Sequence, residues 1–357
     1  MITIMVGGQF GDEGKGGIAD FLSDSHDIFV RFNGGANAGN SVVLPDGKKL
    51  VFKLLPAGGL KPGAILVLTE GMCISIDKLT EEIVTLRRFN KDFTVLISDK
   101  AIIVNNRHRE EDKKNQAAFS SVGTGVGPAN ADRMRRLAEV MGVFNSNGLF
   151  RILDTGEYLN DMIEKGKNIL FIGAHGTELD IHQGGYPYVT TSNCISSSIG
   201  HQAGVHPSLA DEIVLCVKAY STRVGQGKFN DVDEVTAHTI REIGHEYGSV
   251  SGRPRRIGWI DLNQLKRSVR INRPTVIALT MVDVLAGFDT IGIWNGEFDG
   301  FGILEHIPGW NMKDIEDYVS HRACNAFSLF LTKIELATKC TVGIISYGSE
   351  KGKKVRI

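Results

Sequence analysis

The sequence lacks a strong charge of either sign. Forty Lys and Arg residues stand against forty-one Asp and Glu residues, so the formal net charge is −1. A protein that binds nucleic acid usually carries a marked basic excess, and the absence of that excess argues against such a partner. A local basic pocket is still compatible with this balance.

Paired cysteines and long apolar runs are also missing. The scattered cysteines, none of them in a Cys-x-x-Cys pair, are Cys73, Cys194, Cys216, Cys324 and Cys340. Their spacing argues against a disulfide scaffold or a zinc ribbon and favours the reducing cytosol, so a cytoplasmic protein is expected. No run of about 18 apolar residues occurs, so no membrane span is expected. Residues 1–8 have no basic segment, which indicates a buried strand rather than a signal peptide.

Glycine, in contrast, is abundant. Of the 42 glycines, half gather in clusters at residues 7–17, 34–39, 123–127, 173–185, 225–227 and 248–258. Each cluster lies beside an apolar segment with the character of a strand. Because glycine lets a backbone approach a ligand closely, the clusters indicate several ligand-binding loops.

Strand-like and helix-like segments alternate along the chain. Strands are expected at Ile2–Val6, Asp27–Phe32, Ala64–Thr69, Phe93–Ser98, Asn168–Gly173, Glu212–Ala219, Thr275–Met281 and Cys340–Ser346. Helices are expected at Lys15–Leu22, Ile76–Phe89 and within Ile315–Lys339, and Asn105–Gln116 is expected to be exposed. This alternation predicts an α/β fold with a large, mostly parallel sheet flanked by helices. No linker is visible, so residues 1–357 are expected to form a single domain.

The first motif is Gly7–Gly16, which ends in Gly11-Asp12-Glu13-Gly14-Lys15-Gly16. A strand followed by glycines, a lysine and a helix is typical of a phosphate cradle. A strict P-loop requires glycine where Gln9 stands and Ser or Thr where Gly16 stands, so that pattern fails. Asp12 offers a carboxylate instead, which among phosphates points to a metal ligand or a general base. A glycine turn capped by an aspartate is the simpler alternative.

Further motifs rich in small polar and basic residues follow. They are Asn33–Ser41, Gly123–Arg133 with Arg135 and Arg136, Tyr186–Asn193, Ser221–Gly225, Gly248–Arg256, and Asp283 directly after a strand. A plain turn explains the first equally well, and a solvated helix start explains the second. The arginines of the Gly248–Arg256 segment suit a carboxylate or a phosphate. Asp283 suits the Watson–Crick edge of a guanine, although a lone aspartate after a strand is usually a cap.

Together these motifs resemble those of adenylosuccinate synthetases, in the same order from Ile2 to about Gly348. The compact length and the GPANADR segment resemble the archaeal branch and its phage relatives. The resemblance implies the P-loop-related fold of that family and ligation of L-aspartate to C6 of a 6-oxopurine nucleotide. GTP would phosphorylate O6, and the amino group of aspartate would then displace phosphate.

The resemblance also implies the role of each site residue. The catalytic residues would be Asp12, Asn40 and His175, and Mg²⁺ would be held by Asp12 and the carbonyl of Gly39. The nucleoside monophosphate would be bound by Asp12, Glu13, Gly14, Lys15, Asn37, Ala38, Gly39, Asn40, Ser121, Val122, Arg136, His175, Leu179, Thr190, Val224 and Arg253. Aspartate would be bound by Ser249, Val250, Ser251, Gly252, Arg253 and Arg255. GTP would be bound by Gly11, Asp12, Glu13, Gly14, Lys15, Gly16, Gly17, Arg255, Met281, Asp283, Ser346, Tyr347 and Gly348.

Several positions depart from the family pattern. Asn40 replaces the catalytic histidine, and His175 replaces the glutamine that contacts the purine. Val122, Met281 and Pro254 replace a threonine, a lysine and an arginine. Asn40 still donates a hydrogen bond to a phosphate but has no proton to give. One hypothesis is that His175 partly takes over the role of the lost histidine.

Changes around the purine pocket favour dGMP as the substrate, as in phage synthesis of 2-aminoadenine precursors. IMP, converted to adenylosuccinate on the way to AMP, is the close alternative, since Asp12 is retained where many phage members carry serine. A homodimer is implied, with Arg136 reaching the neighbouring subunit. A GTP-binding protein without ligase activity is a weaker alternative, because it does not need the arginine loop. A nucleoside monophosphate kinase is also weaker, because the P-loop Ser or Thr and a lid-like arginine pattern are missing.

Overall fold

The computed structural model describes residues 1–357 apart from 45, 115–120, 147, 249–251 and 299–300. Its centre is a ten-stranded sheet with the order β18-β17-β14-β11-β1-β10-β2-β5-β7-β9. Neighbouring strands are parallel, except that β18 pairs antiparallel with β17. The strands are β1 (Ile2–Gly7), β2 (Ile28–Arg31), β5 (Ala64–Leu68), β7 (Phe93–Ser98), β9 (Arg151–Leu153), β10 (Ile169–Ile172), β11 (Glu212–Lys218), β14 (Val276–Thr280), β17 (Val342–Ser346) and β18 (Lys354–Arg356). The α/β class with a large, mostly parallel sheet is therefore confirmed.

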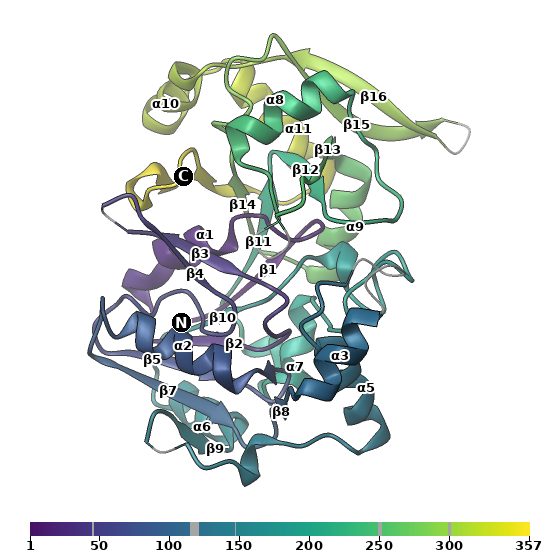
Figure 1. Ribbon diagram of the computed structural model, residues 1–357. Coiled ribbons are helices and arrows are strands. Elements are labelled where there is room, and N and C mark those ends of the chain that lie inside the picture. Colours follow the sequence, from purple (N-terminus) through teal and green to yellow (C-terminus); the bar gives the residue numbers. More distant parts are fainter. Residues whose placement is uncertain (45, 115–120, 147, 249–251, 299–300) are drawn as a thin grey trace.

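The strand order reverses at β1. After β1 the chain builds β2, β5, β7 and β9 outward in one direction, and it then returns to insert β10 between β1 and β2. From there it crosses β1 and builds β11, β14 and β17 in the other direction, as the colours of Figure 1 show. In open parallel sheets, ligands bind outside the carboxyl ends of the strands at such a reversal. The segments after β1, β10 and β11 therefore occupy the expected place for a site.

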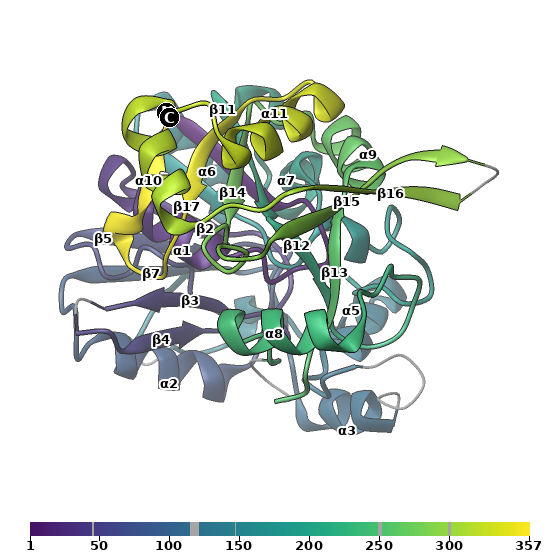
Figure 2. The same cartoon turned by 90° about the horizontal axis from the view of Figure 1, so that it is seen from above.

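Helices cover both faces of the sheet (Figures 1 and 2). They are α1 (Lys15–Leu22), α2 (Ile76–Leu86), α3 (Asn106–Lys114), α5 (Val126–Arg135), α6 (Thr155–Glu164), α7 (Ile199–Gln202), α8 (Glu234–Gly244), α9 (Leu262–Asn272), α10 (Met312–His321) and α11 (Ala326–Thr338). Alternate side chains of β2 enter different cores, with Phe29 on the face of α1 and α2 and Val30 on the face of α6, α7, α9 and α11. This burial of both faces explains why the strands are nearly continuous apolar runs.

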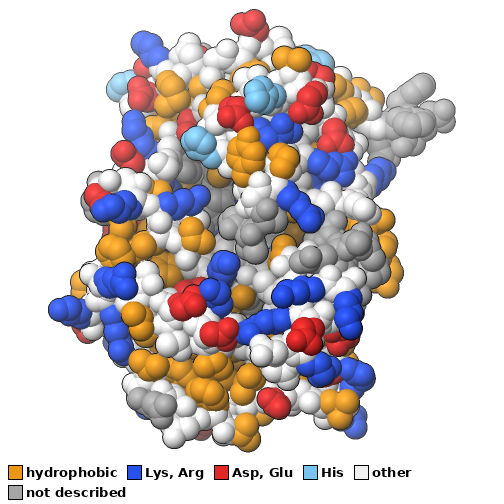
Figure 3. All heavy atoms as spheres, in the orientation of Figure 1, with side chains coloured by type: hydrophobic (Ala, Val, Ile, Leu, Met, Phe, Trp, Pro, Cys, Tyr) orange, Lys and Arg blue, Asp and Glu red, His pale blue; other side chains and the backbone are white. Residues whose placement is uncertain are grey.

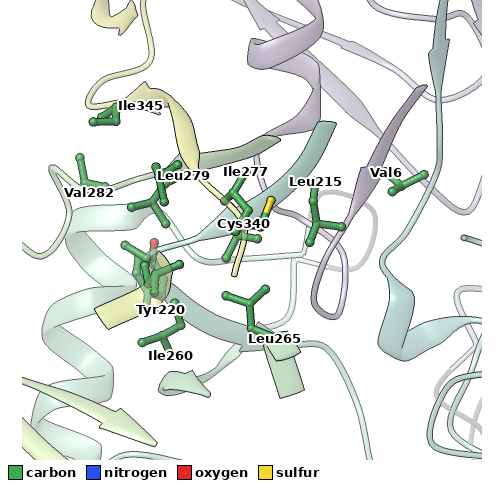
Figure 4. Close-up of a cluster of buried hydrophobic side chains, with 14 of the residues drawn as sticks. Val6, Leu215, Tyr220, Ile260, Leu265, Ile277, Leu279, Val282, Cys340 and Ile345 are labelled. Atoms are coloured by element: carbon green, nitrogen blue, oxygen red, sulfur yellow. The ribbon is translucent and has the colours of Figure 1, made fainter. Parts of the chain in front are cut away.

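A second sheet continues from the central one. It has the order β12-β13-β15-β16 and comprises β12 (Tyr220–Arg223), β13 (Arg256–Asp261), β15 (Thr290–Phe298) and β16 (Phe301–Pro308). Figure 4 shows Tyr220, Ile260 and Leu265 meeting Leu215, Ile277 and Leu279 of the central strands in one apolar cluster. Because this core is shared between the two sheets, we propose that residues 1–357 form a single domain.

Smaller elements complete the described chain. Two further strand pairs are β3 (Asn40–Val43) with β4 (Lys49–Phe52), and β6 (Cys73–Ile74) with β8 (Ile102–Ile103). Short 3-10 turns lie at Ser23–Ser25, Met141–Val143, Thr177–Leu179, Ser196–Ser198, Pro207–Leu209 and Lys351–Lys353. Among the described residues, no helix is both long enough and apolar enough to cross a membrane.

One sequence prediction needs correction. The helix expected within Ile315–Lys339 is two helices, α10 and α11, which are separated where Arg322 takes a left-handed conformation (φ 55°). Asn325 then starts α11 with a capping box, in which its side chain accepts from the Ser328 N–H at 3.0 Å. The segment Asn105–Gln116, expected to be exposed, contains α3, and most of its described residues are exposed, although His108 and Asp112 are buried; residues 115–116 lie outside the described residues.

The cap at Asn325 provides a test of this corrected boundary. Asn325→Ala removes the acceptor for the Ser328 N–H and the donor to the Asp314 carbonyl at 2.8 Å. We expect a loss of about 0.5–2 kcal/mol in the free energy of unfolding, measured by urea denaturation. The Asn325→Asp variant keeps the cap acceptor and should lose less. If one helix ran through this segment, both substitutions would leave the stability unchanged.

Candidate functional site

A cavity of about 570 Å³ opens at the carboxyl ends of the central strands. Among the residues proposed for the monophosphate, those that line it are Asp12, Lys15, Asn37, Ala38, Gly39, Asn40, Ser121, Val122, His175, Leu179, Thr190 and Val224. They come from loops that are far apart in the sequence, and the fold brings them together. Figure 3 shows side chains of both charge signs intermingled on the face of Figure 1, so no broad basic surface is seen there.

The loop between β1 and α1 is built around a buried carboxylate. Glu13 is fully buried, and its Oε1 accepts from the N–H groups of Gln9 (3.1 Å) and Gly11 (2.8 Å). Its Oε2 accepts from Nζ of Lys15 at 2.6 Å. Two N–H groups that the sequence assigned to a phosphate cradle are therefore used by the protein itself. Any contact between Glu13 and a ligand would come through its main chain.

Glycine at position 16 brings β3 against this loop. A Cβ atom on Gly16 would lie 2.4 Å from the main-chain oxygen of Ser41, so no other residue fits without moving the backbone. The contact places Asn40, the first residue of β3, on the cavity wall near α1. Asn40 is 3% exposed, and its Nδ2 has no hydrogen-bond partner in the described structure. A buried amide donor of this kind is costly unless a ligand or water oxygen accepts from it.

Asp12 points away from the buried loop and toward the cavity. It adopts a left-handed conformation (φ 61°), and its side chain remains 38% exposed. Its Oδ2 lies 2.8 Å from a guanidinium nitrogen of Arg255. The proposed general base thus has a cation beside it that belongs to a loop more than two hundred residues later in the sequence.

His175 lies at the end of β10, opposite the Asn33–Asn37 loop. Its main-chain oxygen accepts from Nζ of Lys15 at 2.5 Å, and a Cβ on Gly34 would lie 3.5 Å from its Nε2. Burial, reinforced by the charges of Lys15 and Arg31, lowers the pKa of the His175 imidazole to about 3. The ring is therefore neutral, and in this state it offers a hydrogen bond rather than a positive charge.

The Gly123–Arg133 motif forms the approach to α5. Asp112 of α3 organises this approach, because its carboxylate accepts from the Ser121 hydroxyl (2.6 Å) and the Gly125 N–H (2.8 Å). Helix α5 then begins next to the cavity, with Gly127 and Pro128 in its wall. Arg133 and Arg135 are used internally, by main-chain carbonyls and by Asp132 respectively. Arg136 ends α5 in an exposed position outside the cavity wall.

The residues proposed for the guanine of GTP gather on the other side of α1. Met281 and Asp283 follow β14, and Ser346, Tyr347 and Gly348 end or follow β17, the paired neighbour of β14. The Thr280 hydroxyl donates to the main-chain oxygen of Glu13 at 3.0 Å, which ties this region to the β1 loop. Burial raises the pKa of the Asp283 carboxyl, and the charge of Lys354 opposes that shift.

The proposed aspartate-binding residues are only partly described. Ser249, Val250 and Ser251 lie outside the described residues, whereas Gly252, Arg253 and Arg255 are described. Gly248 lines the cavity, and its N–H donates to the Arg253 carbonyl at 2.8 Å, so the two ends of this segment are held together.

Sequence reasoning missed three buried charged residues beside this site, namely Asp112, Lys218 and Glu246. Asp112 stands in a run of charged residues, and Lys218 and Glu246 are charged residues in polar or apolar contexts, so nothing in the sequence distinguished any of them from a surface residue. Only the fold shows their contacts.

Comparisons with known proteins agree with this geometry. The family model of adenylosuccinate synthetase matches residues 4–152 and 149–355. The chain belongs to the adenylosuccinate synthetase family. The synthetase of Picrophilus torridus is 38% identical over 82% of this chain and 79% of its own length. That of Nitratidesulfovibrio vulgaris (strain Hildenborough) is 31% identical over 99% of both. The protein is therefore a C–N ligase of the type that joins aspartate to a purine.

Two solved structures are also similar. A fully ligated adenylosuccinate synthetase from Plasmodium falciparum is 28% identical with a TM-score of 0.89, covering 99% of both chains. The succinoaminodeoxyadenylate synthetase of cyanophage S-2L is 21% identical with a TM-score of 0.77, covering 99% of this chain and 95% of its own. The second likeness shows the fold alone.

The neutral state of His175 predicts how stability depends on pH. The imidazole has an ordinary pKa of about 6.5 in the unfolded chain and a pKa lowered to about 3 in the folded protein. As the pH falls from about 6.5 toward about 3, His175 binds a proton in the unfolded state but not in the folded state, so the free energy of unfolding decreases. Relative to His175→Gln, the free energy of unfolding of the wild type should decrease by up to about 1.4 kcal/mol for each pH unit. Equal pH profiles of urea unfolding for the two proteins would contradict this.

Proposed function

We propose that the protein phosphorylates O6 of IMP with GTP and then joins L-aspartate to C6, which yields adenylosuccinate. The observation that carries the proposal is the partly exposed Asp12 carboxylate in the cavity wall, beside Arg255 and on a loop that also holds Lys15. The relatives named adenylosuccinate synthetase align with most or all of the chain.

IMP is preferred to dGMP on the strength of these relatives. The sequence alone favoured dGMP, because Asn40 and His175 depart from the family in the purine pocket. The named relatives, at 31–38% identity, are synthetases of adenylosuccinate, and the Plasmodium synthetase superposes more closely than the cyanophage enzyme. The dGMP hypothesis becomes one outcome of the test below.

In the proposed reaction Asp12 accepts the N1 proton of the purine. The O6 oxygen, which gains negative charge, then attacks the γ-phosphorus of GTP, and GDP leaves. The amino group of aspartate attacks C6, and phosphate leaves with the O6 oxygen. Phosphoryl transfer depends on positioning and on neutralising charge. Arg255, next to Asp12, is the cation proposed to supply that charge. The Asn40 amide would donate to a phosphate oxygen, which satisfies its unpaired Nδ2.

His175 would contact the purine as a neutral hydrogen-bonding group. Its Nε2 has no partner in the described structure, although the ring lies in the cavity wall. With its pKa lowered by burial it has no proton to give at neutral pH. His175 therefore suits recognition of a purine edge better than replacement of the family's catalytic histidine.

The residues present fit a magnesium ion that is held mainly by phosphates. Mg²⁺ is commonly bound by one or two carboxylates together with substrate phosphates and water. The described part of the chain has no group of three or more His, Cys, Asp or Glu side chains that could hold a metal by themselves. Asp12 and Gly39 both line the cavity, as such a shared site requires. When bound, Mg²⁺ would neutralise charge on the transferred phosphoryl group.

The donor nucleotide would bind across α1, with its guanine at Asp283 and the Ser346–Gly348 turn. Those groups lie at the ends of two paired strands next to the β1 loop, so a nucleotide bound there would reach the cavity.

The proposed dimer rests on the position of Arg136. Arg136 is exposed and lies outside its own cavity wall, as an arginine donated to a neighbouring subunit must be.

A substrate panel tests the proposed function. The purified protein is incubated with GTP and Mg²⁺ and with IMP, GMP or dGMP, each with and without L-aspartate, and phosphate and the succinylated product are measured. We expect aspartate-dependent product from IMP. Turnover with dGMP but none with IMP would overturn the choice of purine. Phosphate release that ignores aspartate would overturn the ligase proposal.

Asp12→Asn tests the general base. The amide keeps the shape but cannot accept the N1 proton, so kcat should fall by about 10²–10⁴-fold. Asp24→Asn is the matched control, because Asp24 is an exposed carboxylate paired with Lys351 outside the cavity. Retained turnover in Asp12→Asn would remove Asp12 from the mechanism.

A further inference from the structure

Glu246 is a fully buried carboxylate that no part of the proposed reaction uses. It lies just after α8, and it accepts three hydrogen bonds from three different elements. Its Oε1 accepts from Nζ of Lys218 (2.7 Å) and the hydroxyl of Tyr220 (2.5 Å), and its Oε2 accepts from Arg255 (2.6 Å). A carboxylate buried this completely and bonded this fully is held in one position.

The same two residues, Glu246 and Arg255, also form the base of the proposed aspartate-binding segment. The Arg255 N–H donates to the Glu246 carbonyl at 2.9 Å, and Tyr247 bridges to Pro254. The described ends of the 248–253 segment, Gly248 and Gly252–Arg253, adjoin this base, and Gly248 lines the cavity wall. Main-chain and side-chain contacts therefore fix the two ends of that segment to each other.

Arg255 connects Glu246 to the proposed general base. One guanidinium nitrogen meets Glu246 at 2.6 Å, and another meets Asp12 at 2.8 Å. Two cations and two anions thus alternate in the order Lys218, Glu246, Arg255 and Asp12.

Burial alone would raise the pKa of Glu246, but the charges of Lys218 and Arg255 bring that pKa below its ordinary value. Burial and the Glu246 charge raise the pKa of Tyr220 well above its ordinary value, so Tyr220 stays a donor.

We propose that Glu246 is a positioning residue, which fixes the guanidinium of Arg255 against Asp12 and holds the base of the 248–253 segment. This inference rests on the proposed function, since it concerns the placement of the groups that serve it. The simpler explanation is a buried ion pair that only stabilises the fold. That explanation accounts for the bond to Lys218, but it gives no reason for the shared carboxylate to orient a cation that contacts Asp12 in the cavity wall.

Two variants of the same network separate positioning from stability. Glu246→Gln keeps the volume but has one acceptor oxygen and no charge, so Arg255 loses its anchor. Lys218→Met removes another buried partner of the same carboxylate and leaves the Glu246–Arg255 contact in place. Both should lower the midpoint of thermal unfolding, because each leaves a buried charge without its partner.

The kinetic constants should differ between the two variants. In Glu246→Gln we expect kcat to fall by about tenfold to a hundredfold, as for a small misplacement of reacting groups. The KM for IMP should stay near the wild-type value, while the KM for aspartate rises, because the 248–253 segment is loosened. Lys218→Met should keep kcat near the wild-type value. A loss of kcat that follows the unfolding midpoint equally in both variants, or an unchanged kcat in Glu246→Gln, would overturn the proposal.

A readout that does not depend on turnover keeps this test separate from the proposed function. Crystal structures of both variants show whether Arg255 still contacts Asp12. We expect the contact to persist in Lys218→Met and to be lost or displaced in Glu246→Gln. An unchanged Arg255–Asp12 contact in Glu246→Gln would refute the inference, even if the wild type proved inactive on every purine, in which case the proposed function would fail by itself.

Discussion

The carboxylate of Glu13 is buried in the loop after β1, and the rest of the cavity depends on how that charge is satisfied. An uncompensated carboxylate in this position would be very costly, so the loop folds its Gln9 and Gly11 N–H groups and the Lys15 ammonium around it. With Glu13 turned inward, the preceding residue is turned outward and takes a positive φ. The exposed Asp12 is therefore a consequence of the buried Glu13, and two adjacent carboxylates acquire opposite roles from their orientation.

The same loop joins the two sheets. The side chain of Gln9 accepts from the Lys218 N–H at 2.9 Å and donates to the Lys218 carbonyl at 3.2 Å, as a further strand would. Lys218 ends β11, and β12 begins two residues later, so the position of β12 in the second sheet depends directly on β11 of the central sheet. Because Glu246 and Arg255 are bound to that second sheet, the position of Arg255 relative to Asp12 is set by main-chain contacts as well as by charge.

The sequence predicted the central strands well because parallel strands buried on both faces are continuous apolar runs. It did not predict the second sheet, whose strands mix polar and apolar residues, nor the break between α10 and α11. That break has no glycine or proline and depends on a left-handed Arg322 and the Asn325 cap. The glycine motifs located most of the cavity wall. The sequence did not predict the network of Lys218, Glu246 and Arg255, because Lys218 and Glu246 are 28 positions apart and only the folded chain pairs them.

The cations near the cavity differ in what holds them. Lys15 is held by Glu13 and the His175 carbonyl, and Arg223 by main-chain carbonyls, so both are committed to the protein. Arg255 differs, because it sits between a buried carboxylate and one that borders the cavity. A guanidinium keeps its charge across the whole working pH range and binds carboxylate or phosphate equally well. Because Glu246 also holds it, Arg255 keeps a fixed position beside Asp12. The site thus keeps a positive charge whose position, rather than whose protonation, is controlled.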